Sequence, residues 1–436
     1  MGDCGANRSA AKETDMNALD PKRGREMAVV RKPVAKSAAT AHGRWLSPIF
    51  HCLLDRIDSG LEAGSLEALL PDGSRRLLGG RAPGPDCTVH VVRWRALVRL
   101  VTDGSAGWYR AWAAGEWTSP DPVPLFELFM RNGASLGKAG RSQGPARWIG
   151  RLAHWSRRNN RQGSRRNIAF HYDLGNDFYA LWLDRGMHYS SALFRDPGDR
   201  LESLEQAQRR KVDAILDRLD LRDGASMLEI GCGWGGLAEQ AMERRAIRYD
   251  GLTLSVEQAD YARDRLGSGA RILLTDYRDA EGQYDAIASV EMVEAVGERY
   301  WPAYLDAIHR LLKPGGRAAI QYILIDDALF DAYRRGTDFI QTYIFPGGML
   351  LSESRFRALA QARGLEWCDV RRFGQHYAET LRRWRDRFDH VVDEGQLPAG
   401  FDAHFVKLWR YYLMYCEGGF RGGGIDVAQV TLVKPA

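Results

Sequence analysis

The second half of the chain alternates short apolar segments with helical ones, and this alternation constrains the fold more than any other feature. From Ser226 onward, seven segments have the apolar character of strands: "SMLEI", "YDGLTL", "RILLT", "YDAIASV", "RAAIQYI", "WCDVRRF" and "DVAQVTLV". Helical patterns lie between several of them, for example "GLAEQAMERR", "SVEQADYARDRL" and "RYWPAYLDAIHRLL". The alternation predicts an α/β fold, with a seven-stranded, mostly parallel sheet covered by helices on both faces.

A glycine-rich turn follows the first of these strands. Gly231, Gly233 and Gly236 stand in GxGxxG spacing in "EIGCGWGG", a turn that lets a nucleotide approach the backbone at the carboxyl end of a strand. A dinucleotide fold expects an acidic residue about 20 positions further on, at the end of the second strand. Here Asp250 stands at the start of that strand, and its end reads "TLSVEQ".

S-adenosylmethionine suits this turn better than a dinucleotide does. Glu229, just before the glycines, could hydrogen-bond the ammonium group of this cofactor directly or through water. The segment "DYRD" (Asp276 to Asp279) follows the third strand and could serve the adenine end. The residues therefore favour a Rossmann-like, class I methyltransferase over hydride chemistry.

Length and composition predict the domain organisation. A chain of 436 residues is expected to hold two domains and tails. Residues 1–43 are basic and poor in aromatic side chains, which predicts a disordered tail. We predict a small α+β accessory domain for residues 44–140. The segment "GSLEALLPDGSRRLLGG" is typical of a hairpin, and "CTVHVVRW" is typical of a strand. The segment "RALVRLV" fits either a helix or a strand. Residues 168–436 are the predicted catalytic domain.

A basic segment, residues 141–167, joins the two predicted domains. Its first 26 residues hold eight arginines and no acid, and Trp148, Ile149, Leu152 and Trp155 recur at helical spacing. An amphipathic, arginine-rich helix of this kind suits the headgroup layer of an anionic membrane. A solvated linker whose tryptophans dock on a neighbouring domain is the competing interpretation, and nucleic-acid binding is a third, less favoured one.

The remaining composition bears on location. No apolar run reaches the roughly 18 residues needed to span a bilayer, and the N-terminus lacks the order of a secretory signal. Six cysteines are scattered without metal-type spacing, which favours a reducing compartment and predicts no metal site. We therefore expect a cytoplasmic protein that associates peripherally with the inner face of the membrane.

Six motifs occur in one order and carry a family resemblance. They are "HYDLGNDFYALWLDRGMHYSSALF", "EIGCGWGG", "GLTLSVEQ", "SVEMVEAVG", "YWPAYLDAIHRLLKPGG" and "YIFPGGMLLS". Over residues 165–436 the chain resembles the cyclopropane-fatty-acyl-phospholipid synthases and the mycolic acid cyclopropane synthases. The region before it is similar to the N-terminal domain of the bacterial phospholipid enzymes.

The resemblance implies methyl transfer from S-adenosylmethionine to a cis double bond of a phospholipid acyl chain, giving a cyclopropane. An alkene is a weak nucleophile, so the site must align it with the methyl group and exclude water. The resemblance also implies a bound bicarbonate ion as general base. Its ligands would be Ser191, Glu294, Gln321, the backbone of Ile323, and Tyr377. Ser191 and Gln321 depart from the commoner Cys and His of the family, which bears on the product more than on the reaction class.

The resemblance further implies a set of cofactor contacts and a lid. The cofactor contacts are Tyr189, Ser190, Gly231, Gly233, Thr253, Gln258, Tyr277 and Arg278. The segment from Tyr343 to Leu350 is expected to form part of a lid over the acyl chain, because Pro and paired Gly suit a shaped loop, and a plain connector is the alternative. His171 is as well explained by a structural role as by a catalytic one. A homodimer is possible, since relatives often pair.

Three other functions stay open at this point. A related methyltransferase could leave a methyl-branched or methylene-bearing lipid. One of the same fold could act on a soluble amine, which needs neither the anion site nor an acyl tunnel. A non-catalytic binding protein is the third, and the glutamate, the tyrosine and the glycine turn argue against it.

Overall fold

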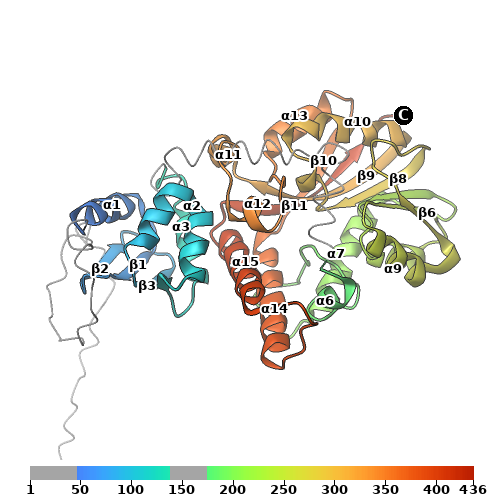
Figure 1. The fold of residues 1–436 in the computed structure, drawn as a ribbon. Coiled ribbons are helices and arrows are strands. Elements are labelled where there is room, and N and C mark those ends of the chain that lie inside the picture. The colour runs from blue at the N-terminus through green and yellow to red at the C-terminus, as the bar shows by residue number, and fades with distance from the viewer. Residues whose placement is uncertain (1–46, 138–173) are drawn as a thin grey trace, which may run out of the picture.

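The computed structural model describes residues 47–137 and 174–436. The predictions for the basic tail, the arginine-rich linker and His171 lie outside these residues. The described chain holds two sheets, a four-stranded one near the N-terminus and a seven-stranded one in the remainder (Figure 1).

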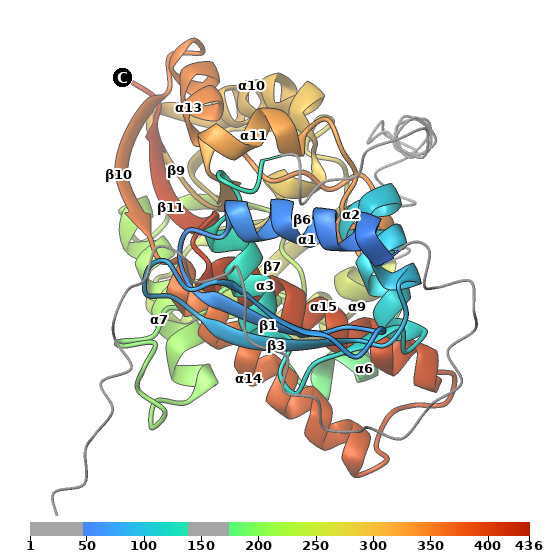
Figure 2. The same ribbon diagram turned by 90° about the vertical axis from the view of Figure 1, so that its left-hand side faces the viewer.

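The N-terminal part is a small sheet packed with three helices. Its elements are α1 (Ser47–Gly60), β1 (Ser65–Leu69), β2 (Arg75–Gly79), β3 (Asp86–Val91), α2 (Arg95–Ala113), β4 (Trp117–Thr118) and α3 (Val123–Arg131). The strand order is β2-β1-β3-β4, and α1 runs across one side of this sheet (Figure 2). The predicted hairpin is present as β1 and β2, and the segment 95–101, left open between helix and strand, is the start of α2.

The seven predicted strands of the second half are all present. They are β5 (Ser226–Ile230), β6 (Arg248–Thr253), β7 (Ala270–Leu274), β8 (Tyr284–Val290), β9 (Leu312–Ile325), β10 (Glu366–Arg372) and β11 (Ile425–Val433), in the order β10-β11-β9-β8-β5-β6-β7. The pairs among β5 to β9 are parallel, whereas β11 is antiparallel to both β9 and β10. The predicted fold class is thus confirmed.

Helices cover both faces of this sheet. They are α6 (Asn176–Ala180), α7 (Leu204–Leu219), α8 (Gly236–Arg244), α9 (Val256–Leu266), α10 (Trp301–Leu311), α11 (Asp327–Tyr333), α12 (Phe339–Tyr343), α13 (Glu353–Gln361), α14 (Gly374–Asp393) and α15 (Ala403–Arg421), with short 3-10 turns at 267–269, 293–295 and 298–300. One apolar cluster joins α7, α8 and α9 to the sheet, and another joins α10 and α13 to its other face. Local signals place the helix starts: Ser203 forms a capping box with Gln206 at α7, and Ser255 caps α9.

The helical hairpin of α14 and α15 connects the two parts of the molecule. Both helices lie between the N-terminal sheet and the large sheet (Figure 1). A continuous core of buried side chains extends from α1 to α3 through α14 and α15 to the segment around Tyr179 and Trp182. The N-terminal part therefore shares its core with helices that border the large sheet.

Candidate active site

The site lies where two neighbouring parallel strands send the chain to opposite sides. Gly231 follows β5 and Glu291 follows β8, and these strands are paired. Ligands of such sheets bind outside the carboxyl ends of strands at this kind of switch point. Gly231 has φ +85°, and a Cβ there would stand 2.9 Å from Cγ of Met292. Only glycine allows the two connections to approach this closely.

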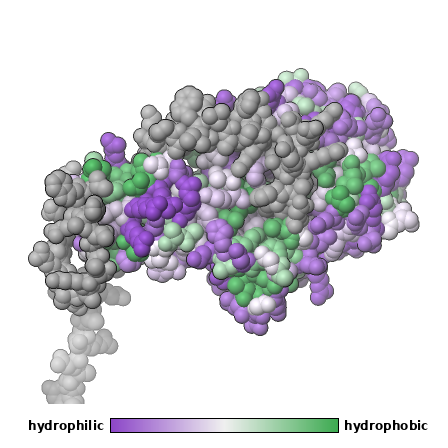
Figure 3. Space-filling view, viewed as in Figure 1, coloured by the Kyte–Doolittle hydropathy of each residue, from purple (hydrophilic) through white to green (hydrophobic). Residues whose placement is uncertain are grey.

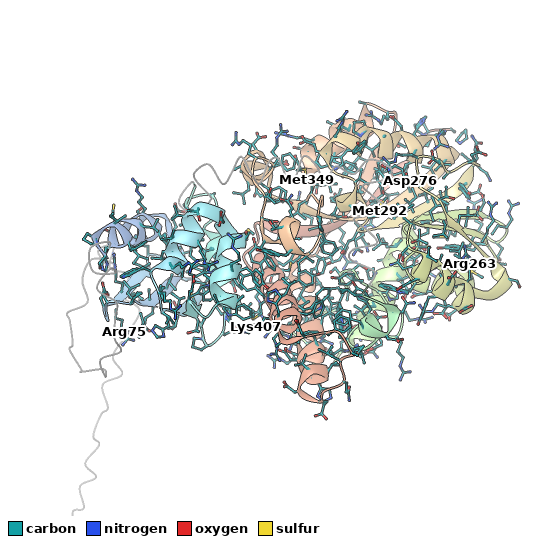
Figure 4. All side chains as sticks on the ribbon, in the orientation of Figure 1. Arg75, Arg263, Asp276, Met292, Met349 and Lys407 are labelled. Atoms are coloured by element: carbon teal, nitrogen blue, oxygen red, sulfur yellow. The ribbon has the colours of Figure 1, made fainter. Side chains whose placement is uncertain are left out.

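The glycine turn has room for a ligand. Gly233 also has positive φ, and a Cβ at this position would meet no atom of the described residues within 4 Å. The backbone is therefore open on the side where a nucleoside would approach, as the predicted cofactor site requires. In Figure 4, Met292 lies between Met349 and Asp276, which mark the lid segment and the connection after β7.

Glu291 is the centre of a polar cluster at this edge. Its Oε1 accepts hydrogen bonds from the amide of Ser191 (2.9 Å) and from Nε2 of Gln321 (2.7 Å). Its Oε2 accepts one from the hydroxyl of Tyr377, at 2.6 Å. Glu291 also has φ +51°, a left-handed conformation that a residue with a side chain seldom adopts. Strain of this kind is retained where a side chain must be held in one place.

The structure thus brings together three of the predicted anion ligands, but around a carboxylate of the chain itself. Ser191, Gln321 and Tyr377 are the groups that the family resemblance assigned to bicarbonate. Ser191 contributes its backbone amide, because its hydroxyl donates to the carbonyl of Ala192 (3.0 Å). With these donors engaged by Glu291, they do not form a free bicarbonate site, and the prediction of bicarbonate does not fit this arrangement.

The other two predicted ligands, Glu294 and Ile323, bond to each other. The amide of Ile323 donates to Oε1 of Glu294, and the carbonyl of Glu294 accepts from the amide of Met349 at 2.8 Å. Oε2 of Glu294 has no hydrogen-bond partner among the described residues. Burial, followed by the charge of Glu291, raises the pKa of Glu294 to about 8. Glu294 is therefore the protonated member of this carboxyl pair at neutral pH.

Opposing effects act on the ionisation of Glu291. Burial is the larger effect and raises the pKa of its carboxyl above the usual value, while the hydrogen bonds from Tyr377, Ser191 and Gln321 lower it in part. Lys211, buried on α7, adds a positive charge nearby, and burial lowers the pKa of this amine to about 8. A carboxylate that accepts three hydrogen bonds beside an ammonium group retains its charge far better than a bare buried one.

The predicted cofactor residues ahead of the sheet are anchored from two sides. The hydroxyl of Tyr189 lies 2.8 Å from that of Tyr412 on α15. Nζ of Lys211 donates to Oγ of Ser190 (2.8 Å), and Nε2 of Gln208 donates to its carbonyl (2.9 Å). These bonds fix the segment that leads directly to Ser191 and its contact with Glu291.

The remaining predicted cofactor residues lie at the carboxyl ends of β5, β6 and β7. Glu229 accepts a hydrogen bond from the hydroxyl of Tyr249, and burial raises its pKa to about 7. Oγ1 of Thr253 donates to Oε1 of Gln258, at 3.0 Å, where β6 leads into α9. After β7, the guanidinium of Arg278 pairs with Asp276 and lies over the ring of Tyr277, with burial raising the pKa of that phenol to about 12. All of these groups lie along the carboxyl edge of neighbouring strands of the sheet, and their contacts with the cofactor stay a prediction.

Aromatic side chains surround the Tyr189 segment. The ring of Tyr189 packs 5.3 Å from Trp384 and 5.6 Å from Trp182, and Phe345 of the predicted lid lies 6.4 Å away. Phe345 also lies 6.3 Å from Tyr412. The predicted lid therefore borders the Tyr189 segment, which is flanked by aromatic side chains.

Sequence reasoning selected Glu294 and missed Glu291, three positions earlier. It also missed Lys211 and Tyr412, because long-range hydrogen bonds leave no local signal. Glu291 could have been found: it directly follows the predicted strand 284–290, and carboxyl ends of parallel strands face the ligand.

Comparisons with known proteins identify the family to which the chain belongs. The family model described as mycolic acid cyclopropane synthetase matches residues 159–430. The tuberculostearic acid methyltransferase UfaA1 of Mycobacterium tuberculosis is 38% identical over 97% of this chain and 98% of its own. The cyclopropane-fatty-acyl-phospholipid synthase of Escherichia coli is 36% identical over 61% of this chain and 66% of its own.

A solved structure gives the same result. The mycolic acid cyclopropane synthase CmaA1, complexed with SAH and CTAB, is 32% identical with a TM-score of 0.57, and the match covers 62% of this chain and 98% of that one. Coclaurine N-methyltransferase, at 19% identity and a TM-score of 0.58, shares the fold. The chain is an S-adenosylmethionine-dependent methyltransferase that belongs to the mycolic acid cyclopropane synthetase family.

Proposed function

We propose that this protein transfers a methyl group from S-adenosylmethionine to the cis double bond of an unsaturated phospholipid acyl chain, and that Glu291 removes the proton lost in the reaction. The observation that carries the proposal is the Glu291 carboxylate, held by Ser191, Gln321 and Tyr377 beside the cofactor turn. It replaces bicarbonate in the role that the family resemblance implied.

The surroundings support a lipid substrate. Aromatic side chains border the site from α14, α15 and the lid segment, as an apolar chain requires. Hydrophobic surface gathers on the protrusion that α14 and α15 form (Figure 3). In the described residues, no helix combines the length and the apolarity needed to cross a bilayer. Peripheral attachment to the inner face of the membrane, on an anionic lipid surface, is part of the proposal.

The chemistry balances with one proton acceptor. The cofactor supplies a methyl group that leaves without its bonding electrons. The π electrons of the alkene form the new carbon–carbon bond, which leaves a cation on the adjacent carbon. When Glu291 takes a proton from the added methyl group, the C–H electron pair closes the three-membered ring. The acyl chain gains one CH2 unit, and the proton resides on Glu291 until it passes to solvent.

The paired carboxyl groups suit this role. Two neighbouring buried carboxyl groups do not both ionise readily, because the charge of one disfavours ionisation of the other. The raised pKa of Glu294, about 8, leaves Glu291 as the ionised member. Faces of Tyr and Trp nearby can stabilise the transient cation without reacting with it.

A second product is favoured by one comparison. A relative that matches nearly the whole chain is named a tuberculostearic acid methyltransferase. If a hydride moves between the two former alkene carbons before the proton is lost, the same base yields a methylene-bearing chain of identical mass. Ozonolysis distinguishes the two products, because it cleaves a methylene group and leaves a cyclopropane intact.

Expression in bacteria that lack such an enzyme tests the function. We expect mass spectrometry to show monounsaturated phospholipid chains with one added CH2 unit. Glu291→Gln keeps the volume but cannot accept the proton, so turnover should fall by about a hundredfold or more, while SAH binding stays unchanged. Full turnover in Glu291→Gln would remove the assigned base, and activity on soluble amines but not on vesicles would remove the lipid substrate.

Glu291→Gly gives a second, independent test. Glycine suits φ +51° and frees the three donors, so added bicarbonate should restore part of the lost turnover. Bicarbonate should have no effect on Glu291→Gln, whose side chain still fills the site. Equal activity of Glu291→Gly with and without bicarbonate would contradict the proposal that Glu291 takes the place of bicarbonate as the base.

A further inference from the structure

A chain of two buried amides connects Glu291 to an arginine at the far side of β11. Gln321 on β9 and Gln429 on β11 are direct cross-strand partners, and both side chains are 0% exposed. Nε2 of Gln429 donates to Oε1 of Gln321 at 3.0 Å, and Nε2 of Gln321 donates to Glu291 at 2.7 Å. Nε of Arg218 on α7 donates to Oε1 of Gln429 at 3.4 Å.

The two ends of this chain determine the orientation of both amides. A guanidinium group only donates hydrogen bonds and an ionised carboxylate only accepts them, whereas an amide can be turned to do either. Arg218 therefore requires the oxygen of Gln429 on its side. The NH2 group of Gln429 must then face Gln321, and the NH2 group of Gln321 must face Glu291.

Neighbouring backbone groups impose the same orientation. The second hydrogen of Gln429 Nε2 points to the carbonyl of Lys211 (3.4 Å), and that of Gln321 Nε2 to the carbonyl of Ser191 (3.4 Å). Turning either amide around would place oxygen against two acceptors in a fully buried position. An unpaired or repelled buried acceptor costs more than the bond it replaces contributes.

We propose that Gln429 is a positioning residue for the reaction: it holds the amide of Gln321 so that an N–H always faces Glu291, which keeps that carboxylate ionised and aimed at the substrate. Gln429 reaches Glu291 only through Gln321. The inference rests on the proposed role of Glu291 as base.

Two variants of Gln429 separate orientation from simple loss of a contact. Gln429→Glu replaces the NH2 group of residue 429 by an oxygen, and Arg218 can still donate to the new carboxylate. Gln321 must then turn to donate to residue 429, and its own oxygen faces Glu291. Gln429→Leu removes all three hydrogen bonds of this side chain, so that only Glu291 and the carbonyl of Ser191 still orient Gln321. Thr431→Val is the matched control, because Thr431 is buried on the same strand and contacts Arg218 (3.3 Å) but not Gln321.

The pH profile of turnover on vesicles that contain monounsaturated phospholipid is the decisive measurement, with SAH affinity as the test of an intact site. The titratable groups that act on Glu291 are Lys211, Tyr377 and Glu294, and all three remain in every variant. For Gln429→Glu we expect the acidic limb of kcat to move to higher pH and kcat to fall by about tenfold or more, with SAH affinity unchanged. Gln429→Leu should give a smaller change of the same sign, and Thr431→Val none.

Unchanged kcat and an unchanged acidic limb in both Gln429 variants would overturn the inference, as would an equal shift in Thr431→Val. Weaker SAH binding together with an unmoved acidic limb would assign Gln429 a purely structural role. These outcomes are distinct from failure of the proposed function, since that failure appears as full activity of Glu291→Gln.

Discussion

At the residue scale, Glu291 has a strained backbone conformation, and the hydrogen bonds of its carboxylate explain why this strain is retained. A side chain at φ +51° costs about 1 kcal/mol or more relative to glycine. Three hydrogen bonds to the carboxylate, each contributing on the order of 1.5–3 kcal/mol, offset the backbone strain and part of the cost of burying the charge. Because the backbone at this point suits glycine, the glutamate is explained by its chemistry and not by the turn.

Glu229 should release a proton when the cofactor site fills. Burial raises its pKa to about 7 in the free protein, so below that pH it is mainly protonated. An ammonium group placed beside it favours the carboxylate and lowers this pKa. SAH binding at about pH 6 should therefore release close to one proton. The affinity for SAH should rise with pH up to about 7.

Calorimetry in two buffers of different protonation enthalpy measures this proton release. Glu229→Gln has no carboxyl group to titrate and should bind SAH with no proton release at the same pH. If the parent protein shows no difference between the buffers, Glu229 does not contact the ammonium group.

At the element scale, the sequence was sufficient to predict the strands of the large sheet, but not the hydrogen bonds among the segments at their carboxyl ends. The parallel strands β5 to β9 are apolar segments, most of them separated by helices, and could be recognised from this. β10 and β11 pair antiparallel, and β10 is largely exposed, so their prediction rested on β propensity. The start of α2 stayed ambiguous, because "RALVRLV" is short and apolar at both periods. The prediction of Glu294 in place of Glu291 has a different cause. Hydrogen bonds from α14 and from the Ser191 segment distinguish Glu291, and no local sequence pattern predicts them.

Helix α15 approaches α3 through glycine. A Cβ on Gly418 would stand 2.5 Å from Cβ of Phe126 and 2.7 Å from the carbonyl of Val123. Gly418→Ala must therefore push the two helices apart, which costs about 1–3 kcal/mol. We expect a lower Tm in differential scanning calorimetry, together with reduced turnover, because α15 also carries Tyr412 of the site.

Gly336→Ala is the control for this crossing. Its Cβ would meet only the carbonyl of Tyr333, at 4.0 Å, so the substitution should leave Tm within about half a degree of the parent. Equal Tm values for Gly418→Ala and Gly336→Ala would mean that α3 and α15 are not closely packed in solution.

At the scale of the whole molecule, the N-terminal part contacts the helix that precedes the predicted lid segment. The family model begins only at residue 159, so this part is an addition to the common catalytic unit. Oγ of Ser105 on α2 accepts a hydrogen bond from the amide of Phe339 (2.9 Å), the first residue of α12. Tyr109, also on α2, packs 5.0 Å from both Phe339 and Tyr343. Helix α12 leads directly into the lid segment, so the added part holds one end of the lid in place.

The buried carboxyl groups make the stability of the cofactor-free protein fall with rising pH. Folding raises the pKa of Glu294 to about 8 and that of Glu229 to about 7, so the folded state binds protons that the unfolded chain has released. Their contribution is complete below the unfolded pKa of about 4.3 and is lost as pH rises through the folded values. Burial lowers the pKa of His188 and His376, which acts in the opposite direction, but only below about pH 6.5. Between about pH 6.5 and 8 we therefore expect Tm to fall by a few degrees. Glu229→Gln/Glu294→Gln should show a flatter profile by scanning calorimetry, and a parent Tm that rises over this range would contradict the assigned ionisation states.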